Sequence, residues 1–285
     1  MLKTDILILK DDDYRKEATI YRDDAAAPKG ALLYFHGGGL LYGDREDLPG
    51  YHIYELTQAG YVIVAFDYPL APGMMLEGIF RDAVDSVNDF CQHKDKYFCD
   101  GLPYFLFGRS AGSYLALLVT AKGILSSPPA GILSYYGYGF LCDVWYASPN
   151  TYYNSFPKIS EKDLPASDGN ISTRGPLETH YNVYVYARQT GKWKDMIYKG
   201  RDKDFFLDYS LRVDAHINCP VLCAHSIGDP DVPYEEFLKL CSQYRSTRFI
   251  STQKIHDFDR LEDHPDTTRL LKNTIEFLNK NTAGC

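Results

Sequence analysis

The chain has 285 residues, of which 45% are hydrophobic and 24% charged, and its formal net charge is −8 at pH 7. This length suffices for one large α/β domain, or for a domain that carries an inserted subdomain. The acidic balance, with no lysine- or arginine-rich run, argues against binding to nucleic acid or to an anionic membrane.

Two further features bear on where the protein works. Residues 1–6 lack the apolar stretch of a signal peptide, and no apolar run approaches the ~20 residues of a membrane span. The seven cysteines are an odd number and are scattered, which favours reduced thiols over disulfides or a zinc site. We therefore expect a cytoplasmic protein with no membrane segment and no metal.

The first elements in chain order are short apolar runs. Residues 6–9 and 18–21 predict two early strands, with the acidic residues 11–13 as a solvated turn between them. Residues 31–35 form a continuous apolar run, which is typical of a strand covered on both faces. This strand leads into H-G-G-G at 36–39, where three glycines leave backbone N–H groups bare enough to face a ligand.

Strands and helices alternate from there. Residues 46–59 predict a helix that ends at Gly60, and 61–66 predict another buried strand. A loop with the sequence D-Y-P-L-A-P at 67–72 precedes a helix predicted at 75–94. This alternation implies a mostly parallel sheet with helices on both faces.

A G-x-S-x-G pattern with Ser110 at its centre separates an apolar run at 104–107 from a helix predicted at 113–121. A strand, a glycine-flanked serine and a helix form the nucleophile elbow of α/β-hydrolases. The serine sits on a strained turn, and Gly108 and Gly112 mark places where strand and helix pass too close for a side chain. The positive end of the helix faces the position where negative charge would develop.

The next strands are predicted at 130–136 and at 221–225, with a connection between them far longer than a crossover requires. We interpret 138–209 as an inserted segment that forms a cap subdomain. The hydrolase core then comprises 1–137 and 210–285.

The inserted segment is rich in aromatic residues, includes both tryptophans, and is expected to be helical around 177–190. We expect some of its rings to line an apolar pocket that favours short acyl groups or compact aromatic esters, and about half of them to form the core of the cap. The rings in question are Trp145, Tyr146, Tyr152, Tyr153, Phe156, Tyr181, Tyr184, Tyr186 and Trp193.

The last third returns to strands and helices. The strand at 221–225 ends in S-I-G-D-P-D-V-P at 226–233, and a helix is predicted at 234–244. A final strand at 248–252 precedes His256, and a terminal helix is predicted from about 266 to 279.

These stretches together resemble one known superfamily. The order of serine, acid and histidine is that of α/β-hydrolases. With H-G-G-G at 36–39, D-Y-x-L-A-P at 67–72, x-S-A-G at 109–112 and D-x-x-V-P at 229–233, the sequence is most similar to hormone-sensitive-lipase-like carboxylesterases. The resemblance covers both core segments and implies an α/β-hydrolase fold, with a mostly parallel central sheet that has helices on both faces.

The catalytic residues follow from this resemblance and from chemistry. Ser110 needs a base to take its proton, and His256 is the candidate base because histidine titrates near neutral pH. The resemblance places the acid four residues before a proline, which selects Asp229 over the rival Asp231. His264, a rival base, begins the predicted terminal helix, which favours a capping or surface role.

Three backbone N–H groups are expected to form the oxyanion hole: those of Gly38, Gly39 and Ala111. The implied reaction is acylation of Ser110, release of an alcohol and hydrolysis by water, and it needs no metal or organic cofactor.

Other residues near these motifs have ordinary interpretations. We expect His36 to order the glycine stretch and His225 to be a hydrogen-bonded core residue. Arg109 stands where the family that this sequence resembles usually has aspartate. Arg109 could bind an acidic group of the substrate or form a structural ion pair, and the sequence leaves both interpretations open. Pro69 and Ser113 replace a usual arginine and a usual glycine.

The leading functional hypothesis is a carboxylesterase acting on a small-molecule ester. An amide-directed hydrolase, such as an aryl formamidase or a peptidase-like enzyme, and an acyl-sugar deacetylase would use the same triad. A non-catalytic binding protein is the third class, which the full set of nucleophile, acid, base and glycines argues against. The sequence leaves the oligomeric state open, a homodimer included.

Overall fold

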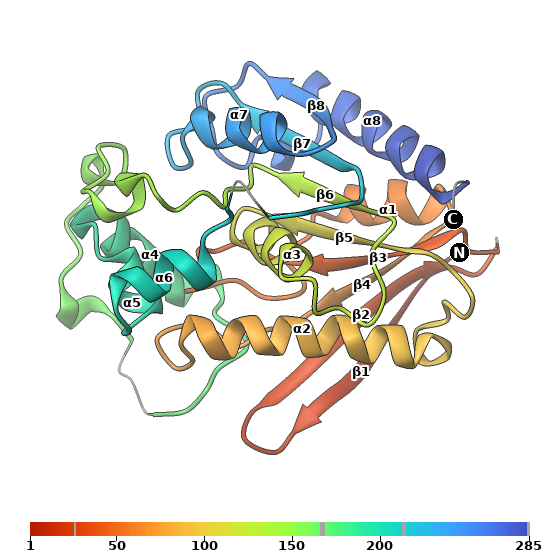
Figure 1. Ribbon diagram of the computed structural model, residues 1–285, viewed down its shortest axis with the longest axis horizontal. Helices are drawn as coiled ribbons and strands as arrows, with labels where there is room; N and C mark the ends of the chain where they lie inside the picture. Colours follow the sequence, from red (N-terminus) through yellow and green to blue (C-terminus); the bar gives the residue numbers. More distant parts are fainter. Residues whose placement is uncertain (26, 166–168, 213–214, 284–285) are drawn as a thin grey trace.

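An eight-stranded sheet runs through the centre of the molecule (Figure 1), in the order β1-β2-β4-β3-β5-β6-β7-β8. The computed structural model describes residues 1–25, 27–165, 169–212 and 215–283. The strands are β1 (Leu2–Asp11), β2 (Arg15–Asp23), β3 (Gly30–Phe35), β4 (Tyr61–Phe66), β5 (Tyr104–Arg109), β6 (Gly131–Tyr135), β7 (Val221–Ser226) and β8 (Ser246–Ser251).

The sheet is mostly parallel, as the sequence predicts. Only β2 pairs antiparallel with its two neighbours, β1 and β4, whereas β4, β3, β5, β6, β7 and β8 run parallel to one another. Every residue of β3 to β7 is buried, because helices cover both faces of these strands. The architecture is that of the α/β-hydrolase fold.

Helices form a layer on each side of the sheet. Helices α1 and α8 pack on one face, while α2, α3 and α7 pack on the other (Figure 1). Their bounds are α1 (Gly50–Gln58), α2 (Leu76–Gln92), α3 (Ala111–Ala121), α7 (Tyr234–Gln243) and α8 (Pro265–Thr282). Within the ranges that the structure describes, no helix combines the length and apolarity that crossing a bilayer would require.

Two boundaries differ from the sequence-based prediction for physical reasons. The helix expected from residue 46 begins only at Gly50, because residues 44–47 form a turn and Pro49 precedes the first helical residue. The first two strands are about twice as long as the apolar runs suggest. Pairing of β1 with β2 draws polar residues such as Lys10 and Asp11 into the ladder.

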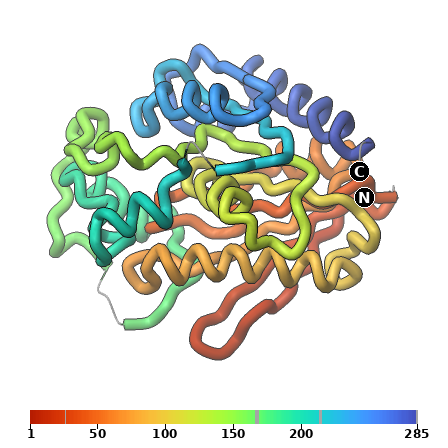
Figure 2. The backbone as a smooth tube through the Cα atoms, in the orientation of Figure 1, coloured from red at the N-terminus to blue at the C-terminus, as the bar shows by residue number. Residues whose placement is uncertain are grey.

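The inserted segment, residues 138–209, lies beyond the carboxyl ends of the parallel strands (Figure 1). Both chain termini lie at the opposite end of the molecule (Figure 2). The helices of the inserted segment are α4 (Leu177–Thr190), α5 (Trp193–Ile197) and α6 (Asp202–Tyr209), with short 3₁₀ turns at Val144–Ala147, Tyr153–Ser155 and Glu161–Asp163. Residues 166–168, which the cap prediction includes, lie outside the described residues.

The two ends of the inserted segment meet. The carbonyl oxygen of Gly139 accepts a hydrogen bond from the Leu211 amide at 2.7 Å, and the Leu141 amide donates to Ser210 Oγ at 2.9 Å. The buried carboxylate of Glu236 on α7 accepts from the amide of Gly139 at 3.2 Å, so the core also holds this junction.

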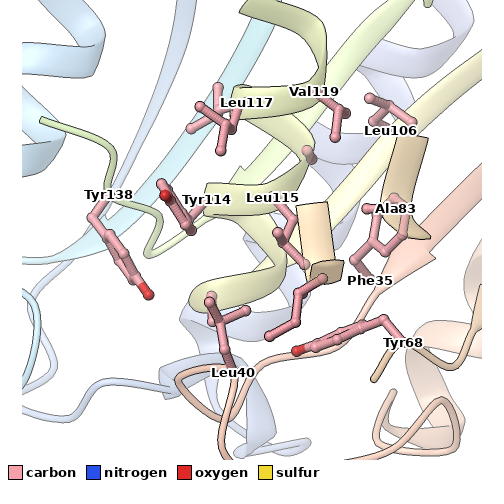
Figure 3. Packing of buried hydrophobic residues seen from close by; sticks show 14 of the residues in the cluster. Phe35, Leu40, Tyr68, Ala83, Leu106, Tyr114, Leu115, Leu117, Val119 and Tyr138 are labelled. Atoms are coloured by element: carbon pink, nitrogen blue, oxygen red, sulfur yellow. The ribbon is translucent and has the colours of Figure 1, made fainter. Parts of the chain in front are cut away.

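Helix α3 lies at the centre of the larger hydrophobic cluster (Figure 3). Its residues from Ala111 to Val119 are all buried, which explains its apolar character on every side. The ring of Tyr114 stacks on that of Tyr138, the first residue of the inserted segment, with ring centroids 5.3 Å apart. The core of the sheet therefore continues directly into the inserted segment.

The turn between β5 and α3 depends on two glycines. A Cβ atom at Gly108 would lie 2.2 Å from the amide nitrogen of Ser113, and one at Gly112 would lie 2.0 Å from the carbonyl oxygen of Phe35. Neither backbone can move without shifting a central strand or the helix. The close approach expected from the sequence is therefore present.

We expect Gly112→Ala to lower the free energy of unfolding by about 3 kcal/mol, because the added methyl overlaps the backbone of β3. Gly50→Ala is the matched control at the start of α1, where an added Cβ meets no atom within 4 Å; its effect should stay within about 1 kcal/mol. Urea unfolding of both variants is the measurement, and equal stabilities would contradict the close approach.

Candidate active site

Ser110 occupies the turn between β5 and α3. Its backbone has φ 52° and ψ −117°, a strained conformation for a residue with a side chain. Its amide donates to the carbonyl oxygen of Tyr135 at 2.9 Å, and its own carbonyl accepts from the Tyr114 amide at 3.1 Å. These bonds to β6 and α3 hold the turn, so the hydroxyl has a fixed position at the carboxyl edge of the sheet.

The structure brings Ser110, His256 and Asp229 together, although they lie in three separate loops. His256 Nε2 lies 2.8 Å from Ser110 Oγ, and His256 Nδ1 lies 2.7 Å from Asp229 Oδ2. The carboxylate makes Nδ1 the protonated nitrogen of the neutral ring, which leaves the Nε2 lone pair to accept the serine hydroxyl proton.

Asp229 is held by the loop that follows β7. Its Oδ1 accepts hydrogen bonds from the amides of Asp231 at 2.8 Å and Val232 at 3.0 Å, and its side chain is fully buried. Burial works to raise the pKa of Asp229, but the charge of His256 and these bonds outweigh burial and lower it. The carboxylate is therefore ionised at neutral pH.

The pKa of His256 is raised to about 9. Burial by itself would lower this pKa, but the negative charge of Asp229 and the hydrogen bond to it outweigh burial. Asp231 and Asp257 add smaller contributions in the same direction. The ring is thus mostly protonated at neutral pH, and it becomes a proton acceptor as the pH rises toward 9.

A buried polar cluster supports the His256 ring. The ring of Tyr136 lies edge-on to His256, with centroids 4.7 Å apart, and its hydroxyl donates to Asp259 Oδ1 at 2.9 Å. Asp259 is fully buried and also pairs with Arg109 at 3.0 Å and His52 at 3.1 Å. Burial works to raise the pKa of Asp259, but the charge of Arg109 holds it well below its usual range.

Arg109 has two carboxylate partners within the protein. Besides Asp259, its guanidinium contacts Asp47 Oδ2 at 3.2 Å, and its side chain is 1% exposed. Of the two interpretations that the sequence leaves open, the structural ion pair is the one observed. No motif in the sequence singles out Asp47, Asp259 or Tyr136. Two of these residues lie beside predicted features of the site. Asp259 follows the candidate base His256 by three residues, and Tyr136 ends a predicted strand, so their positions could have indicated a role.

The glycine loop, residues 36–40, passes beside Ser110. A Cβ atom at Gly37 would lie 3.5 Å from Cβ of Ser110. Within the described part of the chain, the amides of Gly38, Gly39 and Ala111 have no hydrogen-bond acceptor. Gly38 and Gly39 also line the cavity that contains Ser110.

His36 helps to shape this loop. Its ring stacks on Tyr68 with centroids 4.1 Å apart, and its Nδ1 lies 2.8 Å from the carbonyl oxygen of Gly37. The Tyr68 hydroxyl donates to the same carbonyl at 3.1 Å. His36 thus orders the loop, as expected.

The rival residues have other partners. Asp231 pairs with Arg188 at 2.9 Å and accepts from the Tyr184 hydroxyl at 2.7 Å. His264 caps α8, where its Nδ1 accepts from the backbone amide of Asp266 at 3.1 Å. His225 is buried, and its Nε2 lies 3.1 Å from the carbonyl oxygen of Val232. Neither rival histidine contacts Ser110 in the described structure.

Ser110 and His256 open into a cavity of about 400 Å³. Its wall combines the glycine loop with tyrosine rings from the core and from the inserted segment. The tyrosines that line it are Tyr42, Tyr136, Tyr152, Tyr153, Tyr181 and Tyr184. Four of the nine rings named from the sequence line this cavity. Of the other five, Trp145, Tyr146, Phe156 and Trp193 belong to the larger hydrophobic cluster or pack against it, and the Tyr186 hydroxyl donates to Glu161.

Comparison with known proteins places the chain among hydrolases. A family model described as alpha/beta hydrolase fold matches residues 32–192. An alpha/beta hydrolase superfamily protein from Enterococcus faecalis is 26% identical with a TM-score of 0.83, covering 98% of this chain and 99% of that one. A protein with unknown function from Staphylococcus aureus subsp. aureus Mu50 is 28% identical with a TM-score of 0.82, covering 99% of both chains.

Curated relatives are matched over shorter stretches. Esterase LipI of Mycobacterium tuberculosis is 28% identical over 148 residues, which are 51% of this chain and 42% of that protein. The non-reducing polyketide synthase adrD of Penicillium rubens is 28% identical over 178 residues. That match covers 58% of this chain but spans only 7% of the synthase.

We expect the rate at which a fluorophosphonate labels Ser110 to rise roughly tenfold per pH unit below the pKa of His256 and to level off above about pH 9. The labelling rate rises with pH because only the neutral His256 ring can accept the Ser110 proton. Asp257→Asn removes a charge that raises this pKa, so its profile should move to lower pH. Asp263→Asn, at an exposed carboxylate of the following turn, is the control. A labelling rate independent of pH between about 6 and 9 would contradict the coupling of Ser110 to His256.

Proposed function

Because this chain belongs to the alpha/beta hydrolase fold family, we propose that it is a serine hydrolase that cleaves carboxylic esters of short acyl chains or compact aromatic groups. The observation that carries the proposal is the unbroken chain of contacts from Ser110 through His256 to Asp229, beside a cavity of about 400 Å³ that Ser110 and His256 line. The name of the relative Esterase LipI supports the choice of an ester as substrate.

In the proposed reaction, Ser110 Oγ attacks the ester carbonyl carbon while His256 Nε2 takes the hydroxyl proton. The tetrahedral adduct collapses when the carbon–oxygen bond to the alcohol breaks, and His256 returns the proton to the departing oxygen. Water, deprotonated by the same nitrogen, then attacks the acyl-enzyme, and release of the acid restores Ser110. Asp229 stabilises the imidazolium in both halves of the cycle.

The negative charge of each tetrahedral adduct falls on the former carbonyl oxygen. We propose that the free amides of Gly38, Gly39 and Ala111 donate to it, with the N-terminal end of α3 adding its dipole. A donor in such a position contributes about 10²–10³ in rate. No metal or organic cofactor takes part in these steps.

The inserted segment is proposed to act as a cap that sets substrate size. Its rings Tyr152, Tyr153, Tyr181 and Tyr184 narrow a cavity of about 400 Å³. Rigid aromatic walls suit a short acyl chain or a flat ring better than a long flexible chain. We also propose a cytoplasmic location, because all six cysteines in the described part of the chain are free thiols.

We expect Ser110→Ala to lower the turnover of nitrophenyl acetate by at least about 10⁴-fold, because the loss of the nucleophile abolishes covalent catalysis. Ser113→Ala is a matched control on the same helix, since it removes a buried hydroxyl bonded to Ser134 and leaves Ser110 in place. It should cost about 1–3 kcal/mol of stability but keep the turnover. Equal activity of Ser110→Ala and wild type would refute the proposal, and hydrolysis of anilides but not esters would redirect it to amides.

A series of nitrophenyl esters from acetate to palmitate tests the proposed cap. We expect kcat/KM to fall beyond roughly six to eight acyl carbons, because further methylenes gain about 0.8 kcal/mol each only if they can be buried. Tyr152→Ala opens the half-exposed rim and should move the limit to longer chains. Tyr198→Ala, in the same segment but outside the cavity wall, should not. A maximum at dodecanoate or longer in the wild type would show that the segment is a lipase lid.

A further inference from the structure

A tryptophan of the inserted segment is bonded to the glycine loop. The indole Nε1–H of Trp193 donates to the carbonyl oxygen of Gly39 at 2.8 Å. Trp193 is the first residue of α5, and its side chain is buried at 2% exposure. Because water has no access to compete for the carbonyl, this bond constrains the peptide between Gly39 and Leu40 firmly.

A second residue of the segment contacts the same glycine. Gly39 has φ +61°, and a Cβ atom there would lie 2.2 Å from the ring of Tyr184 on α4. The Tyr184 ring is fixed in turn, because its hydroxyl donates to the buried carboxylate of Asp231 at 2.7 Å. Gly39 is therefore held between an aromatic face and an indole N–H, both from the inserted segment.

The glycine loop needs this support because its backbone is unusual. Gly38 has φ +98°, Gly39 +61° and Leu40 +65°, so three successive residues adopt the left-handed region, the last of them without the freedom of glycine. The Gly38 carbonyl is bonded within the loop, to the amides of Leu41 at 3.0 Å and Tyr42 at 3.2 Å. The Gly39 carbonyl has the Trp193 side chain as its partner instead.

We infer that Trp193 is a positioning residue for the proposed oxyanion hole: its N–H fixes the Gly39–Leu40 peptide, which restricts the rotation of Gly39 and thereby holds the preceding amides of Gly38 and Gly39 in place at the cavity that contains Ser110. The inference rests on the proposed function. It gives the inserted segment a role in stabilising the transition state, in addition to its role as a wall of the cavity. A residue that acts in this way should affect turnover and leave ground-state binding unchanged.

The chain contains its own control for this inference. Trp145 and Trp193 both pack against Tyr138, with ring centroids 5.4 and 5.9 Å away. Trp145 lies outside the cavity wall, and its indole N–H is buried without an acceptor among the described residues. Trp193→Phe thus replaces an indole by a smaller ring and removes a hydrogen bond, whereas Trp145→Phe makes the same replacement beside Arg188 and removes no hydrogen bond.

The measurements are kcat and KM for nitrophenyl acetate, and the inhibition constant of a trifluoromethyl ketone whose adduct with Ser110 carries an oxyanion. Active sites are counted by fluorophosphonate labelling, so that unfolded protein is excluded. We expect Trp193→Phe to lower kcat about tenfold and weaken the ketone by a similar factor, with KM within about twofold. Trp145→Phe should change each quantity by less than about twofold.

Two results would overturn the inference: equal kcat and ketone affinity in the two variants, or a raised KM with kcat unchanged. A purely structural role for Trp193 would reduce the number of labelled sites without changing turnover per site. If Trp193→Phe does not fold, the tryptophan analogue benzothienylalanine, which has a sulfur atom in place of the indole N–H, can be incorporated instead. In the Trp145→Phe background Trp193 is the one remaining tryptophan, so the analogue changes this position alone, and the same outcomes apply. A wild-type protein that neither hydrolyses the ester nor labels would refute the proposed function itself.

Discussion

The sharp turn at Ser110 is the constraint on which the rest of the site depends. A serine with φ 52° is strained by itself, and it persists because β5, β6 and α3 fix the backbone on both sides. The turn also brings α3 so close to β3 that a Cβ atom at Gly112 would lie 2.0 Å from the carbonyl oxygen of Phe35. The glycine loop, which leaves the same strand, is thereby brought beside the serine. One close backbone approach thus sets both the direction of the hydroxyl and the position of the free amides.

Charge is distributed around this turn in a fixed arrangement. Arg109 precedes Ser110 and pairs with Asp47 in a loop and with Asp259 in the 3₁₀ turn Phe258–Arg260, both distant from it in sequence. Tyr136 connects Asp259 to the His256 ring. Because these groups are buried and bonded to one another, the histidine cannot rotate without breaking contacts to three elements. Arg109 is therefore best understood as part of the scaffold around the triad.

The fold class, the elbow and the glycine loop could be predicted from the sequence because each is encoded locally. Apolar runs of strand length, a glycine-flanked serine and three consecutive glycines need no knowledge of distant residues. The contacts of Asp259 and Trp193 could not be predicted, because they join residues up to 154 positions apart through packing. Helices α5 and α6 were missed for a related reason. They have five and eight residues, too few for a periodic pattern, and their stability comes from burial of rings such as Phe205.

The junction at Gly139 and Leu211 gives the inserted segment the geometry of an exchangeable module. Its two ends are joined by a hydrogen bond of 2.7 Å, so a replacement of different length and shape could leave the sheet undisturbed. Such an exchange would change the contacts to the glycine loop as well as the wall of the cavity. A transplanted segment without a donor facing the Gly39 carbonyl would leave that buried carbonyl without its partner. If the Trp193 bond acts as inferred, a replacement segment would need a donor at the same position to preserve turnover.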